Sequence, residues 1–279
     1  MFKRPDYCLG VGVNFRNEIA DDLMRHLHHF DFIEIGTERF FLDQFNPHIA
    51  HLIKEKPIVL HGLTLSIGTM NKEVSSLYMK NLSSVLQAIN CEWFSEHIAA
   101  TNVNGLEIRS LMPVDFTEES VQQIAKNAKK VMSLTAKPFL LENITYYYNL
   151  PSSIMTEAQF IKKILITADC GMLLDLNNLY VNAINHRYDP YAFINELPLE
   201  HIVEVHLAGC DYMHNMLVDT HASSIRKDVL NLFEYLCAKT AINGVVIERD
   251  ARLNHFSDLL NEVQTVKDIL KTNRVFKRG

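Results

Sequence analysis

The sequence lacks any apolar run long enough to cross a membrane, and its first ten residues lack the apolar centre of a signal peptide. These absences predict a cytoplasmic protein that has no membrane partner. An excess of positive charge is also missing, because the formal net charge is -6 at pH 7. A negative balance argues against nucleic acid or an anionic membrane surface as the main partner.

Regularly spaced cysteines and phosphate-binding loops are also absent. The cysteines number five, an odd count, and none of them forms a CxxC pair. Neither a disulfide framework nor a thiolate zinc site is therefore expected, and most of these cysteines should be reduced thiols in the core. No GxGxxG or GxxxxGK[ST] pattern occurs, which removes the common nucleotide-binding interpretations.

The composition fits a single large α/β domain. With 279 residues, 48% of them hydrophobic, the chain can bury a substantial core. There is no Gly/Ser-rich linker, so one domain over residues 1–279 is expected. Eight apolar segments rich in β-branched or aromatic residues predict buried strands. They are residues 9–15, 32–36, 57–63, 91–99, 138–144, 171–177, 201–208 and 244–249.

Between these strands, apolar and charged residues alternate at the three- and four-residue spacing of surface helices. The segment 38–54 contains Pro47, which predicts a short or delayed helix there. Eight strand and helix units at this chain length favour a closed (β/α)8 TIM barrel over an open doubly wound sheet. The other predicted helices are residues 17–30, 72–89, 116–135, 157–168, 224–239 and 256–271.

The segment 171–186, GMLLDLNNLYVNAINH, places a carboxylate, several amides and an imidazole directly after a predicted strand. Oxygen and nitrogen groups of this kind are ligands for divalent transition metals. Asp175 and Asn178 would converge if the strand ended in a helical turn. The turn-forming chemistry of asparagine accounts for the same residues, so both interpretations stay open for this stretch alone.

The ends of the other predicted strands help to choose between the metal-site and the turn interpretation, because TIM barrels assemble their sites at the C-terminal ends of the strands. Six consecutive predicted strands end in histidine or carboxylate, and clustered carboxylates would repel one another unless cations neutralise them. The number of candidate ligands is too large for one metal ion and is enough for two or three ions that share bridging carboxylates. The candidate metal ligands are His61, His97, Glu142, Asp175, Asn178, His186, His206, Asp219, His221 and Glu248.

The ligand types leave the metal open. Imidazole and carboxylate without thiolate indicate iron, manganese or zinc. Four further acidic residues are either partners that orient histidine rings or ordinary rim salt bridges; they are Glu34, Glu96, Glu204 and Asp250. The run Tyr146, Tyr147 and Tyr148 would line a substrate groove or simply pack over a loop.

Several motifs together resemble a known family along nearly the whole chain. They are, in order, HGLTLSIG, SEHIA, LLENITYY, LLDLNNLYVNAINHRYDP, EVHLAGC, DTHA and IERD. This set resembles the multinuclear non-heme iron-dependent oxidative enzymes, the MbnB- and TglH-like family. The resemblance implies a TIM barrel that holds two or three irons and uses dioxygen to modify ribosomally made precursor peptides, often at cysteine.

Carried over residue by residue, the resemblance divides the ligands between two sets. A central pair of irons, of mixed Fe(II)/Fe(III) state, would be held by His61, His97, Glu142, Asp175, His206 and Glu248. A third, more labile ion would be held by Asn178, His186, Asp219 and His221. Catalysis would depend above all on Asp175, His206 and Glu142.

The chain departs from the family pattern at two places. The usual Ser-Asp-His of the fourth strand reads Ser95-Glu96-His97 here, and the usual glycine after His186 is Arg187. Neither change removes a ligand, but both alter the pocket. Because a precursor peptide is larger than a barrel pocket, the resemblance also implies a small partner protein that binds the peptide's leader.

Two other classes remain as alternatives. One is a divalent-metal hydrolase or isomerase that resembles the endonuclease IV or xylose isomerase group, although the acidic net charge speaks against a DNA enzyme. The other is a non-catalytic metal-handling protein. Dioxygen consumption separates them, because a storage protein would show none and a hydrolase would act without oxygen.

Overall fold

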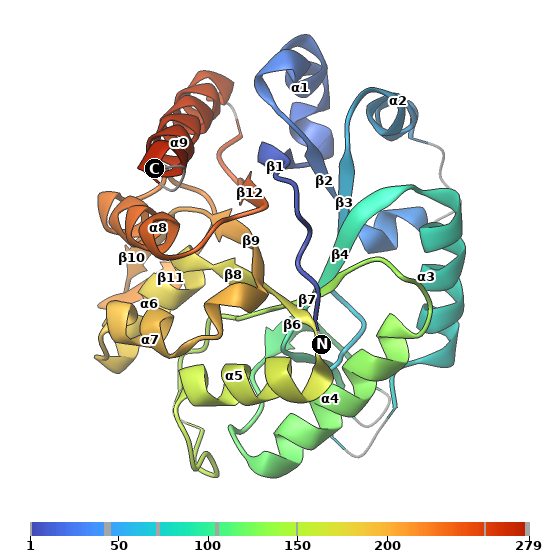
Figure 1. The fold of residues 1–279 in the computed structure, drawn as a ribbon, viewed down its shortest axis with the longest axis vertical. Coiled ribbons are helices and arrows are strands. Elements are labelled where there is room, and N and C mark those ends of the chain that lie inside the picture. Colours follow the sequence, from blue (N-terminus) through green and yellow to red (C-terminus); the bar gives the residue numbers. More distant parts are fainter. Residues whose placement is uncertain are drawn as a thin grey trace.

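The computed structural model describes residues 2–41, 46–70, 73–103, 106–148, 150–253 and 255–276. Eight parallel strands close into a barrel in the order β1-β12-β9-β8-β7-β4-β3-β2, which confirms the predicted (β/α)8 fold (Figure 1). The barrel strands are β1 (Gly10–Asn14), β2 (Ile33–Gly36), β3 (Ile58–Gly62), β4 (Cys91–His97), β7 (Phe139–Glu142), β8 (Gly171–Asp175), β9 (Ile202–Leu207) and β12 (Gly244–Ile247).

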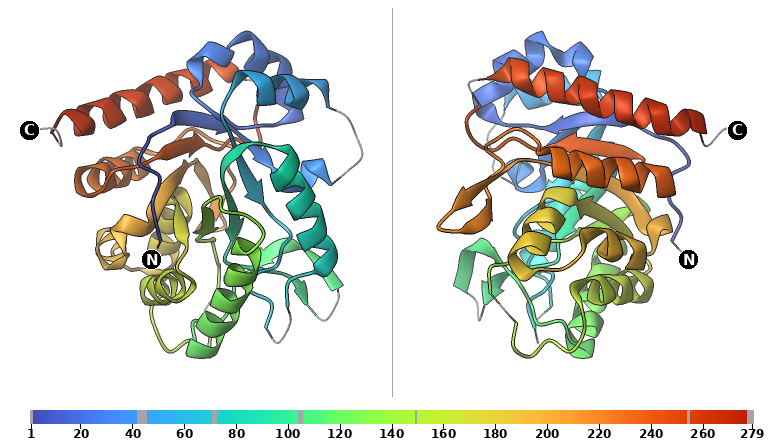
Figure 2. Two further views of the ribbon diagram at one scale, coloured as in Figure 1. Left: turned by 45° about the vertical axis from the view of Figure 1, so that its right-hand side comes forward. Right: turned by 90° about the vertical axis from the view of Figure 1, so that its left-hand side faces the viewer.

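Helices surround this barrel, and the longest of them, α9, lies beside α8 (Figure 2). Pro47 occupies the first turn of α2, where its missing N–H costs no hydrogen bond, so the delayed helix is confirmed. The helices are α1 (Ala20–Arg25), α2 (Pro47–Glu55), α3 (Ser76–Ala88), α4 (Glu118–Met132), α5 (Glu157–Ala168), α6 (Leu176–His186), α7 (Pro190–Glu196), α8 (Lys227–Lys239) and α9 (Phe256–Phe276). Residues 42–45 and 72, which belong to two predicted helical segments, lie outside the described residues.

Several predictions of local structure were wrong, and the predicted strands 138–144 and 244–249 end two residues early, at Glu142 and Ile247. The predicted helix 17–30 is broken into α1 and two 3₁₀ turns, Asn17–Ile19 and Leu27–His29, and the second turn leads into the fully buried Phe30. The predicted strand 171–177 ends at Asp175, because the Asp175 side chain accepts a hydrogen bond from the Asn178 N–H and caps α6. The predicted strand 91–99 ends at His97.

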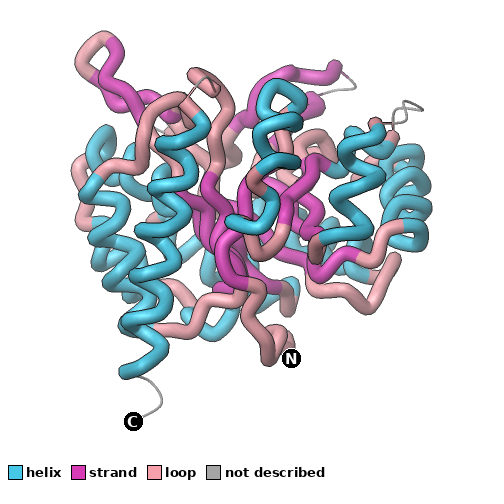
Figure 3. The backbone as a smooth tube through the Cα atoms, turned by 90° about the horizontal axis from the view of Figure 1, so that it is seen from above, coloured by secondary structure: helices cyan, strands magenta, loops and turns pink. Residues whose placement is uncertain are grey.

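Two hairpins extend the barrel mouth. They consist of β5 (Ala100–Val103) with β6 (Leu106–Met112), and of β10 (Cys210–Met213) with β11 (Met216–Asp219). Both hairpins lie at the end of the molecule opposite the two termini (Figure 3). This is the end at which the barrel strands finish, so the hairpins border any site built there.

The alternation of side chains along each strand separates an apolar layer from a polar one. One cluster of fully buried residues comes from the barrel strands and the residues next to them: Phe32, Val59, Trp93, Leu140, Leu173, Val203 and Val246. Five of these apolar residues are followed, two positions later in the sequence, by a carboxylate or a histidine. The pairs are Phe32 and Glu34, Val59 and His61, Leu140 and Glu142, Leu173 and Asp175, and Val246 and Glu248. Because successive side chains point to opposite faces, residues two apart share a face. The same alternation that fills the barrel with apolar side chains therefore turns polar ones toward its mouth.

All five cysteines are thiols rather than halves of disulfides, and every one except Cys8 is buried, as expected for reduced core thiols. No described helix is both long and apolar enough to span a bilayer.

Candidate metal centre

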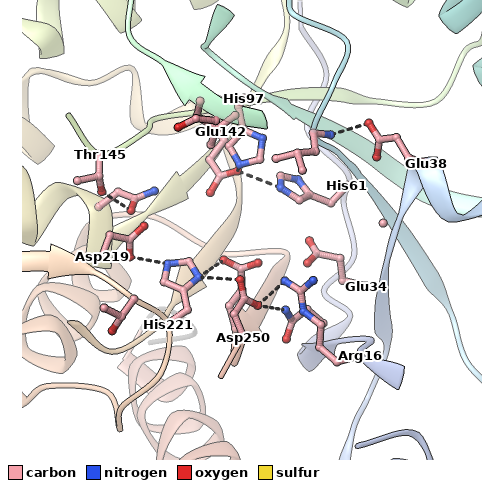
Figure 4. A pocket seen from close by; sticks show the side chains of 18 of the residues that line it. Arg16, Glu34, Glu38, His61, His97, Glu142, Thr145, Asp219, His221 and Asp250 are labelled. Atoms are coloured by element: carbon pink, nitrogen blue, oxygen red, sulfur yellow. Dashed lines mark hydrogen bonds and ion pairs between the residues drawn. The ribbon is translucent and has the colours of Figure 1, made fainter. Parts of the chain in front are cut away.

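A cavity of about 630 Å3 opens at the C-terminal ends of the strands (Figure 4). Seven of the ten predicted ligands line it, while Asp175 and His206 lie at its floor with no exposed surface. The seven are His61, His97, Glu142, Asn178, Asp219, His221 and Glu248. Side chains distant in the sequence therefore meet in one place, as the barrel geometry predicted.

The first group of potential ligands consists of His61, His97 and Glu142, from the ends of β3, β4 and β7. Glu142 Oε2 lies 3.3 Å from His61 Nε2 and 3.1 Å from His97 Nε2. One ligand atom from each residue falls within 4.8 Å of the others. This spacing suits a common cation.

The second group consists of Glu142, Asp175, His206 and Glu248, and all four residues are buried. His206 Nδ1 lies 3.4 Å from Glu142 Oε1 and 3.2 Å from Glu248 Oε2. Glu142 thus belongs to two groups and offers a different oxygen to each.

The third group consists of His221, Glu248 and Asp250. His221 Nδ1 lies 3.2 Å from Glu248 Oε2, and its Nε2 lies 2.7 Å from Asp219 Oδ1. The backbone of His221 has φ 47°, in the left-handed region, which is a strained conformation for a residue other than glycine. Because Glu142 and Glu248 each join two groups, these three groups form one continuous chain of potential ligands, and a fourth group of Glu34, Glu204 and His206 meets this chain at His206.

Several ligand atoms in this chain are buried without a hydrogen-bond partner. They are Glu142 Oε2, Asp175 Oδ2, His206 Nδ1 and His221 Nε2. Each of them lies 2.7–3.9 Å from another charged group of the same cluster without forming a hydrogen bond. An unsatisfied buried polar atom costs about 1–3 kcal/mol, so the cluster needs a compensating group. Metal ions would satisfy all four, and the residues present therefore fit a multinuclear centre.

Hydrogen bonds on the far side of each ring leave the inward nitrogen free. His97 Nδ1 lies 3.0 Å from the Gly62 carbonyl oxygen, which can only accept, and His61 Nδ1 lies 2.8 Å from Ser95 Oγ. His206 Nε2 lies 3.0 Å from the Glu34 carboxylate. A ring nitrogen that donates outward presents the lone pair of the other nitrogen inward, as a metal ligand must.

The acidic residues expected to orient histidines behave in different ways. Glu34 contacts His206, and Glu96 Oε1 lies 3.4 Å from His97 Nδ1. Glu204 instead accepts a hydrogen bond from Trp93 Nε1 at 2.8 Å. Asp250 pairs with Arg16 and lies 3.9 Å from His221 Nδ1. Two of the four therefore orient a ring directly.

Burial and crowded charge shift the pKa values at the centre. Burial alone would lower the pKa of His97, but the Glu142 carboxylate, with Glu96 and Glu248, raises it to about 9. Burial raises the pKa of Asp175 well above its usual value; attraction to His221 opposes this rise, and repulsion from Glu142 and Asp219 adds to it. Without a metal the cluster must therefore hold protons, and cations would take their place.

This chain matches the model of the RiPP precursor modification enzyme family MbnB/TglH/ChrH over residues 10–271. RiPPs are ribosomally synthesised and post-translationally modified peptides. The chain belongs to this enzyme family. The match covers all eight barrel strands and every candidate ligand, and it confirms the family resemblance read from the motifs.

Relatives of similar length support the assignment. A UPF0276 protein of Acinetobacter baylyi is 32% identical over 262 residues, which cover 93% of this chain and 90% of the relative. A UPF0276 protein of Shewanella sediminis is also 32% identical over 262 residues, with 92% and 93% covered.

Solved structures share only the fold. The zinc-containing IolI protein superposes with a TM-score of 0.61 at 11% identity, covering 95% of this chain and 99% of that one. An L-ribulose 3-epimerase superposes with a TM-score of 0.60 at 13% identity, with 96% of each chain covered. Both likenesses place this family member among TIM barrels.

His186 is the one predicted ligand that lies away from the centre. Its Nε2 is 2.9 Å from the Tyr146 carbonyl oxygen, and its ring stacks on Tyr146 at 4.2 Å between centroids. Asn178, Asn182 and His186 follow one another at four-residue spacing along α6 and so share a helix face. Their side chains bond the backbone of residues 143–146. This stripe fastens the loop after β7, and only Asn178 also reaches the cavity.

Replacing His186 with alanine should therefore leave the metal content of this family member unchanged. The expected cost is about 1 kcal/mol in the free energy of unfolding, from the lost contact with the Tyr146 carbonyl. Plasma mass spectrometry and urea unfolding of the variant measure the two effects. A loss of one ion per chain would instead return His186 to the ligand set.

A buried glutamate beneath the same loop should make stability depend on pH. Burial raises the pKa of Glu157 from 4.5 to about 8, although Tyr188 and Asn182 donate hydrogen bonds to it. Between these two values the folded state holds a proton that the unfolded state has released. Stability therefore falls as pH rises through this window and levels off above it.

Glu157→Gln should remove that dependence, because glutamine mimics the neutral acid. At pH 8 the metal-free variant should be more stable than the wild type by about 1–3 kcal/mol, and at pH 4.5 the two should be similar. Urea unfolding at both pH values measures the difference. Glu119→Gln, an exposed substitution in the first turn of α4, is the matched control and should show no such effect.

Sequence reasoning missed several residues of the cavity wall. Arg16 and Arg39 line it, and both lie within three residues of the ends of β1 and β2. A search of the residues just after each strand, rather than of the strand ends alone, would have found them. Of the tyrosine run, Tyr147 lines the cavity and accepts a hydrogen bond from the Asp219 N–H at 3.0 Å, whereas Tyr146 packs against His186.

Proposed function

We propose that this enzyme carries out an iron- and dioxygen-dependent oxidative modification of a RiPP precursor peptide, with cysteine as the modified residue. Two or three iron ions of mixed Fe(II)/Fe(III) state would be held by nine of the ten predicted ligands, with His186 left out. The observation that carries the proposal is the chain of three ligand groups joined through Glu142 and Glu248. Bridging carboxylates of this kind hold metal ions close enough to act together.

The bound irons would supply one-electron chemistry and the activation of dioxygen. The protein's own part is to hold and shield them. Glu142 and Glu248 provide negative charge between neighbouring positions, while Glu34 and Ser95 fix the rings of His206 and His61. Asp175 and His206 seal the floor against water, since neither has exposed surface. The open side of the cavity is left for the peptide.

The substrate side of the proposal rests on the family and on the shape of the mouth. The family modifies RiPP precursors, and the cavity of about 630 Å3 admits a side chain and its immediate neighbours rather than a whole peptide. We therefore also propose a small partner protein that binds the peptide's leader. Co-purification with the product of a neighbouring gene tests this, and efficient turnover of the precursor by the isolated chain would remove the need for a partner.

Metal analysis and dioxygen consumption test the proposal together. Protein expressed with added iron should contain two to three irons per chain by plasma mass spectrometry and show a coupled mixed-valent signal by electron paramagnetic resonance or Mössbauer spectroscopy. Addition of the precursor peptide should start dioxygen consumption. Zinc or manganese at the same stoichiometry, with turnover independent of oxygen, would overturn the proposal in favour of a hydrolase or isomerase.

A further inference from the structure

Two arginines line the same cavity as the carboxylates and imidazoles of the ligand groups. Arg16 follows β1, and Arg39 lies in the 3₁₀ helix Thr37–Phe40 that follows β2. Because β1 and β2 are neighbouring strands, both arginines belong to the same sector of the mouth. Figure 4 shows Arg16 across the cavity from Thr145 and Asp219. This sector therefore brings two guanidinium groups to the mouth, and one of them, Arg16, pairs with Asp250 of the third ligand group.

Neither guanidinium is fully satisfied by the protein. Arg16 pairs with Asp250, which also accepts a hydrogen bond from Asn14, but Arg16 Nε is buried without a partner. Arg39 makes a long hydrogen bond of 3.4 Å to Asn17 Oδ1 and lies over the Phe15 ring at 5.2 Å. No carboxylate of the described residues forms an ion pair with Arg39.

The carboxylate nearest to Arg39 in sequence is already engaged. Glu38 Oε1 accepts hydrogen bonds from the N–H groups of Leu63 and Thr64, both at 2.8 Å, and from the Tyr78 hydroxyl at 2.8 Å. Burial, followed by repulsion from Arg16, lowers the pKa of Arg39. Two partly buried like charges are unfavourable without an anion between them. An external anion would pair with Arg39 and share Arg16 with Asp250.

We propose that Arg16 and Arg39 bind a carboxylate of the peptide substrate beside the residue that is modified. Each guanidinium group can donate a pair of hydrogen bonds to a carboxylate, and the Phe15 ring packs against one face of the Arg39 guanidinium. The carboxylate is either the C-terminus of the peptide or the side chain of an adjacent Asp or Glu. This inference rests on the proposed function, because it takes the cavity to be the peptide site.

The test compares small probes that differ only in a carboxylate. The first pair is N-acetylcysteine and N-acetylcysteinamide, which represent a C-terminal residue with and without its carboxylate. The second pair is N-acetyl-Cys-Asp-amide and N-acetyl-Cys-Asn-amide, which represent a following acidic or neutral residue. Dissociation constants are measured by calorimetry on protein loaded with zinc, so that no oxidation occurs.

The wild type should bind the carboxylate member of at least one pair about tenfold more tightly or better, the gain typical of a charge-assisted hydrogen bond. The pair that shows the preference identifies the source of the carboxylate. Arg39→Gln should abolish the preference with unchanged zinc content, and Arg39→Lys, which keeps the charge without the fork, should retain part of it. Arg25→Gln, an exposed change on α1, is the matched control and should behave as the wild type.

Two results would overturn the inference. One is equal binding of both members of both pairs by the wild type. The other is a preference that survives in Arg39→Gln, since the metal ions would then hold the carboxylate. Neither outcome depends on iron content or dioxygen consumption, so the inference and the proposed function can fail separately.

Discussion

Glu142→Gln should abolish assembly of the metal centre while leaving the barrel folded. Glu142 is the only one of these residues to belong to both the first and the second ligand group, and its two oxygens face three imidazoles. Glutamine keeps the shape but loses the charge and one acceptor. Because even an outer-shell partner changes metal affinity by about 10–100-fold, loss of this ligand should cost at least about 100-fold.

The clearest measurement is the dependence of thermal stability on metal. At a free metal concentration 1,000 times the dissociation constant, binding stabilises the wild type by about 4 kcal/mol, or roughly 10 °C in Tm for a chain of this size. Glu142→Gln should show about a third of that shift or less, together with reduced metal content. Glu157→Gln makes the same chemical change at a buried glutamate outside the centre and should keep the full shift. A Glu142→Gln protein with wild-type metal content would refute the bridging role.

The barrel could be predicted from the sequence because its signals are local and repeated. Each buried strand, such as Phe139–Glu142, is a short apolar run, and each is followed by a helix with three- and four-residue periodicity. Closure and strand order then follow from the rule that parallel strands need helical crossovers. The polar layer at the mouth was also predictable, because side-chain alternation fixes that Leu140 and Glu142 face the same way.

Other features depend on contacts that no local pattern contains. For the residues of α6 the sequence left two interpretations open, a helical turn after the strand or an asparagine-rich turn, because asparagine also stabilises turns. Capping by Asp175 and bonds from Asn182 to the 143–146 loop stabilise the helix instead. His186 was included among the ligands because it lies near Asp175 in sequence, but eleven residues of helix carry it away from the centre. The β10–β11 hairpin has His214 and Asn215 between its strands and so lacks a glycine signal, whereas the Asn104-Gly105 pair between β5 and β6 is a hairpin signal that the sequence reading missed.

The ligand groups also differ in how far each depends on the others. His61 and His97 belong only to the first group and His221 only to the third, although His221 Nε2 lies 3.9 Å from Asp175 Oδ2. Glu142 connects the second group to the first, and Glu248 connects it to the third. Removing a residue at either end of the chain should therefore release one ion, whereas removing a bridge should disturb two.

His221→Ala should accordingly lower metal stoichiometry by one ion per chain and abolish turnover, with a loss of at least about 100-fold. Its imidazole is the only nitrogen ligand of the third group, and Glu248 and Asp250 alone leave that position weakly held. Zinc titration followed by calorimetry counts the ions, and His61→Ala should lose a different single ion from the first group. His214→Ala is the matched control, because His214 is exposed and shares the left-handed backbone of His221, with φ 48°. Full stoichiometry in His221→Ala, or complete loss of metal in both His61→Ala and His221→Ala, would show that the three groups do not act as separate positions joined by shared glutamates.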